Sequence, residues 1–271
     1  MRRQSDDWNK EDVQSRMLNI ERLNYILKEL QEKKSVYVNE LSKKYYVSPS
    51  TIRRDLDQLE KEGLVRRTYG GCVLIERQNA EIPIQLRINE QSTEKDIIAS
   101  LATKLIEDGM FIFLDSTSTT SHLVKFLENH RNLKILTTSA QTALQCLDHL
   151  PAQIYCTGGW MSTYSRGFYG ESARSRIEEF YTDFSFFSVR GISFERGIAD
   201  VNEDDVYMKQ TILKNCRKSV LLCDSKKFGI ISYRTVCDFS KIDYLITDKQ
   251  PDHEWMEMLE KNMVKVIYPK D

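Results

Sequence analysis

The feature that most constrains the fold is a short, sharply bounded helix and the hairpin predicted to follow it. Ser48 is a favourable N-cap, and Pro49 suits the first helical position because its missing N–H would be unpaired there in any case. Gly63 is typical of a residue that ends a helix. Two β-prone runs, 64–69 and 72–75, flank a Gly-Gly pair, which predicts a tight hairpin.

Two further helices are predicted ahead of this segment. The first is an amphipathic helix with apolar residues at i, i+3, i+4 and i+7, namely Leu23, Ile26, Leu27 and Leu30. A second, shorter helix is marked by Val38, Leu41 and Tyr45. Three helices followed by a hairpin are the plan of a winged helix-turn-helix, a DNA-binding fold.

The third helix, from residue 49 to about residue 62, is where DNA recognition is expected. At 100° per residue, Ile52, Leu56 and Leu59 lie on one face and point to the core. The opposite face, centred on Arg54, offers guanidinium, hydroxyl, amide and ammonium groups. Such groups can donate to phosphates and to base edges in the major groove.

The hairpin would add a basic wing to this helix. Arg66, Arg67 and Tyr69 flank its tip and could reach the DNA backbone or the minor groove. Asp55 lies beside the core face, so we expect it to orient a neighbouring side chain rather than touch DNA. A solvated charged surface would explain the helix taken alone, but the cap, the glycine stop and the basic hairpin together favour DNA binding. The residues expected to contact double-stranded DNA are Ser48, Ser50, Thr51, Arg53, Arg54, Gln58, Lys61, Arg66, Arg67 and Tyr69.

Charge is distributed unevenly along the chain. The formal net charge is −1, yet residues 16–75 hold twelve basic and eight acidic side chains. A basic block joined to an acidic remainder suggests one domain that faces a polyanion. A surplus of this size is also common on an ordinary solvated surface, so it supports the DNA-binding hypothesis without deciding it.

The run VSPSTIRRDLDQLEKEGLVRRTYGG, residues 47–71, closely resembles the N-terminal signature of the DeoR family of bacterial transcriptional regulators. The family's recognition helix, its Leu-Glu pair and its Gly-Gly wing are matched by Val47, Ser48, Thr51 through Leu56, Leu59-Glu60 and Gly70-Gly71. The resemblance covers about residues 17–248. It implies a regulator of carbohydrate-metabolism genes, typically a repressor, that responds to a phosphorylated sugar or related metabolite. It also implies a C-terminal effector domain of the sugar-phosphate isomerase and CoA-transferase type.

Beyond residue 93, apolar strand-like runs alternate with helix-like stretches. The expected strands are 110–114, 134–136, 153–156, 184–189, 220–223, 244–246 and 264–268. The expected helices are 97–106, 120–127, 140–147 and 206–216. This alternation predicts a mainly parallel sheet covered on both faces. The fold class is therefore α/β, with an N-terminal winged helix-turn-helix followed by a mainly parallel α/β effector domain.

Ligands bind such sheets beyond the C-terminal ends of the strands. Four loops expected there, 115–120, 137–139, 157–159 and 224–229, are rich in small polar residues. Hydroxyls, glycine amides at helix starts and a lysine together suit a phosphate. Helix capping explains any single loop equally well, but four such loops at one edge favour a pocket for an anionic ligand.

The DeoR resemblance assigns particular residues to effector binding in these loops. By position they are Asp115, Ser116, Ser118, Thr119, Thr138, Ser139, Gly158, Gly159 and Lys227. Arg190 joins them because it stands where the family has an acid and could supply a cation for an anionic ligand. Arg190 could equally close the pocket by pairing with a carboxylate.

Two other positions depart from the family pattern. Thr117 replaces a glycine, so a turn that tolerates positive φ carries a β-branched side chain. Thr138 replaces an asparagine and loses an amide donor. These departures keep a second hypothesis open, a regulator whose degenerate pocket serves mainly as an oligomerisation core. A third hypothesis, a sugar-phosphate isomerase or acyl-CoA transferase, is disfavoured by Arg190 because isomerisation needs a positioned base.

The domain boundaries follow from these patterns. We expect a flexible tail at 1–16, the winged helix-turn-helix at 17–76, a linker at 77–92 and the effector-sensing and oligomerisation domain at 93–271. A regulator of this kind is expected to form a homodimer or tetramer that binds inverted half-sites.

Composition excludes several other classes of protein. No stretch of the 271 residues approaches the apolar length of a membrane span, and the N-terminus lacks an apolar signal core. We therefore expect a cytoplasmic protein that has no membrane partner. The six cysteines form no CxxC pair and are expected to be reduced packing residues. No cofactor and no metal are expected, and no catalytic residue is assigned.

Overall fold

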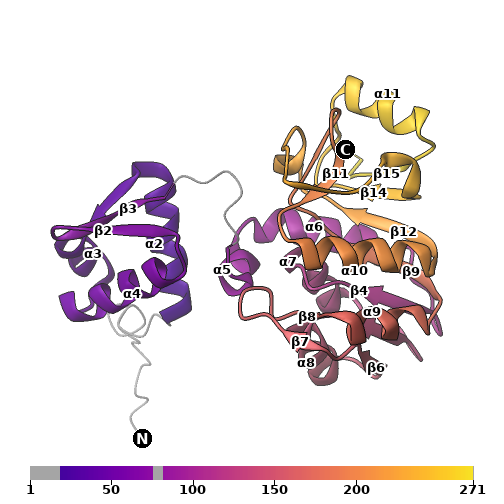
Figure 1. Cartoon of the computed structure of the whole chain (residues 1–271), viewed down its shortest axis with the longest axis horizontal. Helices are drawn as coiled ribbons and strands as arrows, with labels where there is room; N and C mark the ends of the chain where they lie inside the picture. The colour runs from indigo at the N-terminus through magenta and orange to yellow at the C-terminus, as the bar shows by residue number, and fades with distance from the viewer. Residues whose placement is uncertain (1–18, 76–81, 271) are drawn as a thin grey trace, which may run out of the picture. The chain divides into compact units, whose positions relative to one another are not determined.

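The computed structural model describes residues 19–75 and 82–270. The chain divides into two compact units, Met1–Glu90 and Gln91–Asp271, which Figure 1 draws in indigo to violet and in magenta to yellow. The tail expected at 1–16 and the start of the expected linker, 77–81, lie outside the described residues.

The first unit is a winged helix-turn-helix. Its elements are α2 (Asn19–Lys33), β1 (Ser35–Tyr37), α3 (Val38–Tyr45), α4 (Pro49–Lys61), β2 (Val65–Thr68), β3 (Gly71–Leu74) and α5 (Ile84–Asn89). The three strands form an antiparallel sheet in the order β1-β3-β2. The apolar faces predicted for the three helices meet in one core, where Leu23, Ile52 and Leu59 are fully buried.

Helix α4 begins and ends where the sequence predicts. The Ser48 hydroxyl accepts a hydrogen bond from the Thr51 backbone N–H at 3.2 Å, and Pro49 occupies the first turn. Gly63 follows the helix with a φ of 67°, the left-handed conformation that favours glycine. Ahead of α4, Tyr46 also adopts a left-handed conformation, with φ of 52°, and ends α3.

The two glycines of the wing have different tasks. Gly70 takes a φ of 80° and makes the turn between β2 and β3. Gly71 lies so close to β1 that an added Cβ would stand 2.1 Å from the Val36 carbonyl oxygen. The Gly-Gly pair therefore permits both the turn and the pairing of β3 with β1.

The described part of the expected linker contains helix α5. Its Leu86 is buried in the core of the first unit, and Ile82 packs against the same cluster. The first compact unit accordingly extends to Glu90. Helix α5 is short and follows Pro83, which begins it as an N-cap, so its sequence offered no periodicity to detect.

The second unit is built on a seven-stranded parallel sheet in the order β15-β14-β12-β9-β4-β5-β6. The strands are β4 (Phe111–Leu114), β5 (Lys134–Thr137), β6 (Gln153–Cys156), β9 (Thr182–Phe187), β12 (Cys216–Leu222), β14 (Tyr244–Ile246) and β15 (Lys265–Ile267). All seven strands expected from the sequence are present. The strand order reverses between β4 and β9, because the chain runs outward through β5 and β6 and then returns to the other side of β4.

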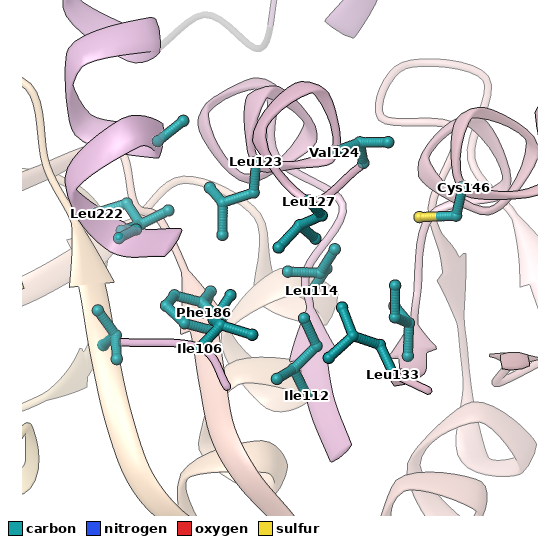
Figure 2. Close-up of a cluster of buried hydrophobic side chains, with 14 of the residues drawn as sticks. Ile106, Ile112, Leu114, Leu123, Val124, Leu127, Leu133, Cys146, Phe186 and Leu222 are labelled. Atoms are coloured by element: carbon teal, nitrogen blue, oxygen red, sulfur yellow. The ribbon is translucent and has the colours of Figure 1, made fainter. Parts of the chain in front are cut away.

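Helices cover both faces of this sheet. They are α6 (Ser92–Thr103), α7 (Ser118–Ser121), the 3₁₀ helix η1 (His122–Phe126), α8 (Ala140–His149), α9 (Glu171–Glu178), α10 (Glu203–Lys214) and α11 (His253–Lys261). On one face, side chains from α6, η1 and α8 pack against Ile112, Leu114 and Phe186, as Figure 2 shows. On the other face, α9 and α10 pack against Phe113 and Leu136. The fold class predicted from the sequence is confirmed.

Several small elements were not predicted. They are the hairpin β7 (Trp160–Met161) and β8 (Phe168–Tyr169), the antiparallel strands β10 (Gly191–Ser193), β11 (Gly197–Asp200) and β13 (Arg234–Cys237), and the 3₁₀ helices η2 (Ser225–Lys227) and η3 (Phe239–Lys241). Most are too short to show a periodicity. Two of the helices, α9 and α11, were also missed.

All six cysteines are free thiols, and three of them are fully buried: Cys72, Cys146 and Cys223. Burial raises the pKa of the Cys72 thiol to about 11 and that of Cys146 to about 12, which keeps both protonated and unreactive. These residues pack as the sequence predicts. Within residues 19–75 and 82–270, no helix is long and apolar enough to cross a membrane.

Candidate functional site

The outward face of α4 is open to solvent. Ser50, Arg53, Arg54 and Lys61 are exposed, whereas Ile52, Leu56 and Leu59 are fully buried. Thr51 and Gln58 lie at the rim and are partly buried. The Gln58 amide donates to Glu62 Oε1 at 3.3 Å. The face thus presents two guanidinium groups and an ammonium, with the exposed Asp57 carboxylate, which pairs with Arg67, among them.

Hydroxyl groups gather at the start of α4. Ser48 Oγ lies 2.7 Å from Ser50 Oγ and 2.9 Å from Thr51 Oγ1, and all three residues are at least partly exposed. Ser48 also caps the helix, so its hydroxyl serves the fold first. The cluster places hydroxyl donors where the chain enters the exposed face.

The wing presents its predicted residues unequally. Tyr69 is fully exposed at the tip, and Arg66 is exposed on β2. Arg67 instead lies toward α4: its Nε is 3.4 Å from Asp57 Oδ1, and its backbone N–H donates to Glu60 Oε1 at 2.8 Å. Arg67 therefore fixes the wing to the recognition helix, a role that the sequence did not indicate.

Asp55 fixes α4 to α2. The Arg22 guanidinium donates to both Asp55 carboxylate oxygens, at 2.5 and 3.0 Å, and Asn19 Nδ2 donates at 2.8 Å. The Asp55 side chain is 1% exposed and that of Arg22 is 8% exposed. Asp55 therefore holds the neighbouring Arg22 and Asn19 side chains, as expected of a residue that orients a neighbouring side chain.

A second polar contact fixes α3 to α2. The Glu29 carboxylate accepts hydrogen bonds from Tyr45 Oη at 2.7 Å and from the Lys44 ammonium. Burial alone would raise the pKa of Glu29, but the hydrogen bonds from Lys44, Tyr45 and Lys33 lower it below its ordinary value. The helix-turn-helix is thus tied to α2 at two places, through α3 and through α4.

In the second unit, a polar site lies where the strand order reverses. Asp115 follows β4 and Ser188 follows β9, and the Ser188 N–H donates to Asp115 Oδ2 at 3.0 Å. The other Asp115 oxygen accepts from the hydroxyls of Thr117 and Thr120, both at 2.6 Å. Ligands of open α/β sheets bind at such reversal points. Asp115 therefore orders both sides of the expected ligand site.

Lys227 lies at the same point. Its ammonium donates to Ser188 Oγ at 2.8 Å and to Thr119 Oγ1 at 3.5 Å, and it lies 3.4 Å from Asp224 Oδ2. The loop that carries it is anchored to the end of β14, because Asp248 accepts hydrogen bonds from the Ser225 N–H and hydroxyl. Loops after β4, β9 and β12 thus place one ammonium and several hydroxyls together.

Other predicted ligand residues lie toward β5 and β6, where the β7–β8 hairpin covers the strand ends. The Thr138 carbonyl accepts from the Phe168 N–H at 2.6 Å, and Ser139 forms a β-bridge with Gly167. The Ser139 hydroxyl caps α8. A Cβ on Gly159 would stand 2.2 Å from the Tyr169 carbonyl oxygen. These residues pack the hairpin onto the sheet, and within the described part of the chain Lys227 hydrogen-bonds to Ser188 and Thr119 rather than to any of them.

The positions that depart from the family pattern fit without strain. Thr117 takes a φ of −97°, so its β-branched side chain is compatible with the turn, where it caps α7. Thr138 is buried, and Arg190 is partly buried beyond the end of β9.

Sequence reasoning missed the polar residues behind Asp115. Tyr169 Oη lies 3.4 Å from Ser116 Oγ and donates to Asp205 Oδ1 at 2.7 Å. Lys209, one turn further along α10, pairs with Asp200. The signal available was a lysine on the buried side of α10, three residues before Ile212, where an apolar residue is expected.

A winged helix-turn-helix with an exposed basic helix, followed by an α/β unit with a polar site at its reversal point, defines a DNA-binding regulator with a sensor domain. Family models agree: a DeoR-like helix-turn-helix domain matches residues 22–78, and a DeoR C terminal sensor domain matches residues 90–249. The chain belongs to the DeoR family of transcriptional regulators, as its recognition-helix signature predicts.

Relatives match over nearly their whole length. The HTH-type transcriptional regulator GolR of Listeria innocua is 33% identical over 86% of this chain and 92% of its own. The putative aga operon transcriptional repressor of Escherichia coli O157:H7 is 30% identical over 91% and 93%. The glycerol-3-phosphate regulon repressor of Escherichia coli K12 is 28% identical over 92% and 99%. A solved D-ribose-5-phosphate isomerase covers 51% of the chain and 54% of its own at TM-score 0.39 and 19% identity, too weak a likeness to carry an argument.

Proposed function

We propose that this regulator is a repressor that binds operator DNA through α4 and the wing and releases it when a phosphorylated sugar or related metabolite binds at the reversal point of the sheet. Relatives named as repressors of the aga operon and of the glycerol-3-phosphate regulon support this proposal. The observation that carries it is the position of the Lys227 ammonium among Ser188, Thr119 and Asp224.

The proposed DNA binding rests on the solvent exposure of side chains on α4 and the wing. Arg53, Arg54 and Lys61 are the proposed contacts of α4 with base edges and phosphates, joined at the helix start by Ser50. From the wing, Tyr69 is the most exposed candidate. Gln58, Ser48, Thr51, Arg66 and Arg67 complete the proposed interface, with Arg67 acting in part through its contact with Asp57.

The proposed ligand binding rests on the Lys227 ammonium and on the hydroxyl groups beside Asp115. Ser116, Ser118 and Thr119 are buried beside Asp115, and Lys227 supplies the cation. We also propose further contacts with a larger ligand, from Thr138, Ser139, Gly158, Gly159 and Arg190. Phosphate binding by hydroxyls and an ammonium in a partly buried site is strong because the hydrogen bonds are charge-assisted.

A thermal-melt screen tests the proposed binding of a phosphorylated ligand. Purified protein is heated with phosphorylated sugars and polyols and with their unphosphorylated forms. A ligand at 100 times its Kd stabilises the folded state by about 2.7 kcal/mol, enough for a shift of several degrees. Lys227→Ala should abolish the shift. Lys226→Ala, which removes an exposed neighbouring ammonium, should keep it. A shift that survives Lys227→Ala would place the ligand elsewhere.

The regulator is proposed not to be an enzyme, since its relatives are regulators. One observation makes the alternative worth testing: burial raises the pKa of the Asp205 carboxyl to about 6, a value suited to a general base. Ribose 5-phosphate and glucosamine 6-phosphate incubated with the protein should remain unchanged. Turnover that disappears in Asp205→Asn would establish an isomerase.

The active form is proposed to be a homodimer or homotetramer. Helix-turn-helix proteins bind two half-sites related by a two-fold axis, so two α4 helices are needed. We also propose a cytoplasmic location, because the proposed operator would be chromosomal DNA. Light scattering of the free protein and of its DNA complex would give the number of chains, and a monomer in both would contradict this proposal.

A further inference from the structure

A polar chain, buried at Ser116, Tyr169 and Lys209 and partly exposed at Asp205, continues from the proposed phosphate site to the opposite side of Asp115. Ser116 Oγ contacts Tyr169 Oη, which donates to Asp205 Oδ1 at 2.7 Å. Asp205 and Lys209 lie one turn apart on α10, and the Lys209 ammonium pairs with Asp200 at the end of β11. Residues from β4, β8, α10 and β11 therefore converge behind the same strand end.

The ammonium of Lys209 is deeply buried and incompletely bonded. Lys209 is 2% exposed, yet among the described residues its three N–H groups form one hydrogen bond, to Asp200. A buried charge that lacks hydrogen-bond partners is costly, so a purely structural network would be expected to fill these donors. A ligand oxygen would satisfy the N–H groups that have no acceptor among the described residues.

The charges around Lys209 define the chemistry of that ligand group. Burial alone would lower the pKa of Lys209, but the Asp200, Asp205 and Asp115 carboxylates raise it, so the ammonium stays charged. Three carboxylates around one ammonium repel a second phosphate. The same carboxylates accept hydrogen bonds from hydroxyl groups, to which Lys209 can donate in return.

We propose that Asp205 and Lys209 read a hydroxyl group of the effector, while Lys227 and its hydroxyl neighbours hold the phosphate. The effector is then a phosphorylated polyol or sugar, and not a bisphosphate or a phosphate on an apolar group. This inference rests on the proposed phosphate site at Lys227. It adds a residue pair that determines which phosphorylated compound the regulator accepts.

Pairs of ligands that differ by one hydroxyl test the inference. Glucose 6-phosphate and ribose 5-phosphate, each with its 2-deoxy analogue, and glycerol 3-phosphate, with propyl phosphate as its analogue without hydroxyls, are titrated calorimetrically into the full-length protein. For the compound that binds, loss of the hydroxyl that is read should weaken binding at least tenfold, because the buried groups are left unpaired. Asp205→Ala should reduce this discrimination to less than threefold.

Three further variants make the result specific. Asp204→Ala, which removes the neighbouring carboxylate on α10, should keep the wild-type discrimination. Lys227→Ala should weaken the binding of both members of a pair and leave their ratio unchanged. If Asp205→Ala does not fold, Asp205→Asn preserves the size of the side chain and should lower the ratio at least threefold.

The outcomes separate the two proposals. Absence of binding by any of these phosphorylated compounds to the wild type would overturn the phosphate site, and this inference with it. Binding that depends on Lys227, with the same discrimination in wild type and in Asp205→Ala or Asp205→Asn, would overturn this inference alone. Stronger binding of the deoxy or propyl member by the wild type would overturn it as well.

Discussion

The buried pair of Arg22 and Asp55 should determine the stability of the DNA-binding unit. Removal of one partner of a buried ion pair costs about 3–5 kcal/mol, because the remaining charge stays buried without its partner. Asp55→Ala removes both hydrogen bonds to Arg22 and the one from Asn19. The higher helix propensity of alanine offsets at most about 0.7 kcal/mol. We therefore expect a net destabilisation of about 3 kcal/mol or more.

Hydrogen exchange followed by mass spectrometry resolves this effect within the full-length protein. Peptides from α2 and α4 should exchange about 100-fold faster or more in Asp55→Ala, since about 1.4 kcal/mol corresponds to a factor of ten. Peptides from β4 and β9, in the second compact unit, should keep their wild-type rates.

Two controls define the mechanism. Asp57→Ala removes an exposed carboxylate on the same helix that pairs with Arg67, and it should cost less than about 1 kcal/mol. The double variant Arg22→Met/Asp55→Ala should be more stable than Asp55→Ala alone, because no buried charge remains. Equal losses in Asp55→Ala and Asp57→Ala, or no recovery in the double variant, would refute the reasoning.

Three other changes have defined outcomes. Arg54→Ala should weaken binding to a selected operator by about 1–3 kcal/mol in a fluorescence titration, if its guanidinium reads a base pair; an unchanged affinity removes Arg54 from the readout. Gly71→Ala should destabilise the wing by about 1–3 kcal/mol, because the new methyl group meets the Val36 carbonyl; slow exchange of β3 amides in the variant would argue otherwise. The pKa of Asp205 is about 6 in the folded protein against an ordinary 3.8, so its stabilising contribution is complete below about pH 4 and is lost as the pH rises through 6. Relative to Asp205→Asn, the free energy of unfolding of the wild type should accordingly rise by up to about 3 kcal/mol as the pH falls from 7 to 4. A pH-independent difference between the two proteins in urea unfolding would contradict this.

Much of the fold was accessible from the sequence because the signals are local. The strands of the parallel sheet are apolar runs between polar loops, and α4 is bounded by Ser48, Pro49 and Gly63. Helix α5 escaped detection because it is a single short helix whose burial depends on contact with α2. The β7–β8 hairpin escaped for the same reason, since two-residue strands have no alternation to measure.

The ligand site was predictable only in part. Asp115 and Lys227 lie in loops whose composition marks them, and the strand order brings those loops together. Tyr169 and Asp205 are 36 residues apart, and neither lies in a loop that follows a strand of the main sheet. Their meeting depends on how the hairpin and α10 pack, which no local pattern specifies.

The most direct test of the proposed function measures how ligand binding changes DNA binding in one experiment. An operator is selected from random DNA duplexes with the full-length protein, and its affinity is measured by fluorescence anisotropy with and without the phosphorylated compound that stabilises the protein most. We expect the compound to weaken operator binding about tenfold or more in the wild type and to change nothing in Lys227→Ala, whose affinity without ligand stays at the wild-type value. A compound that binds through Lys227 and leaves the wild-type operator affinity unchanged would contradict the account.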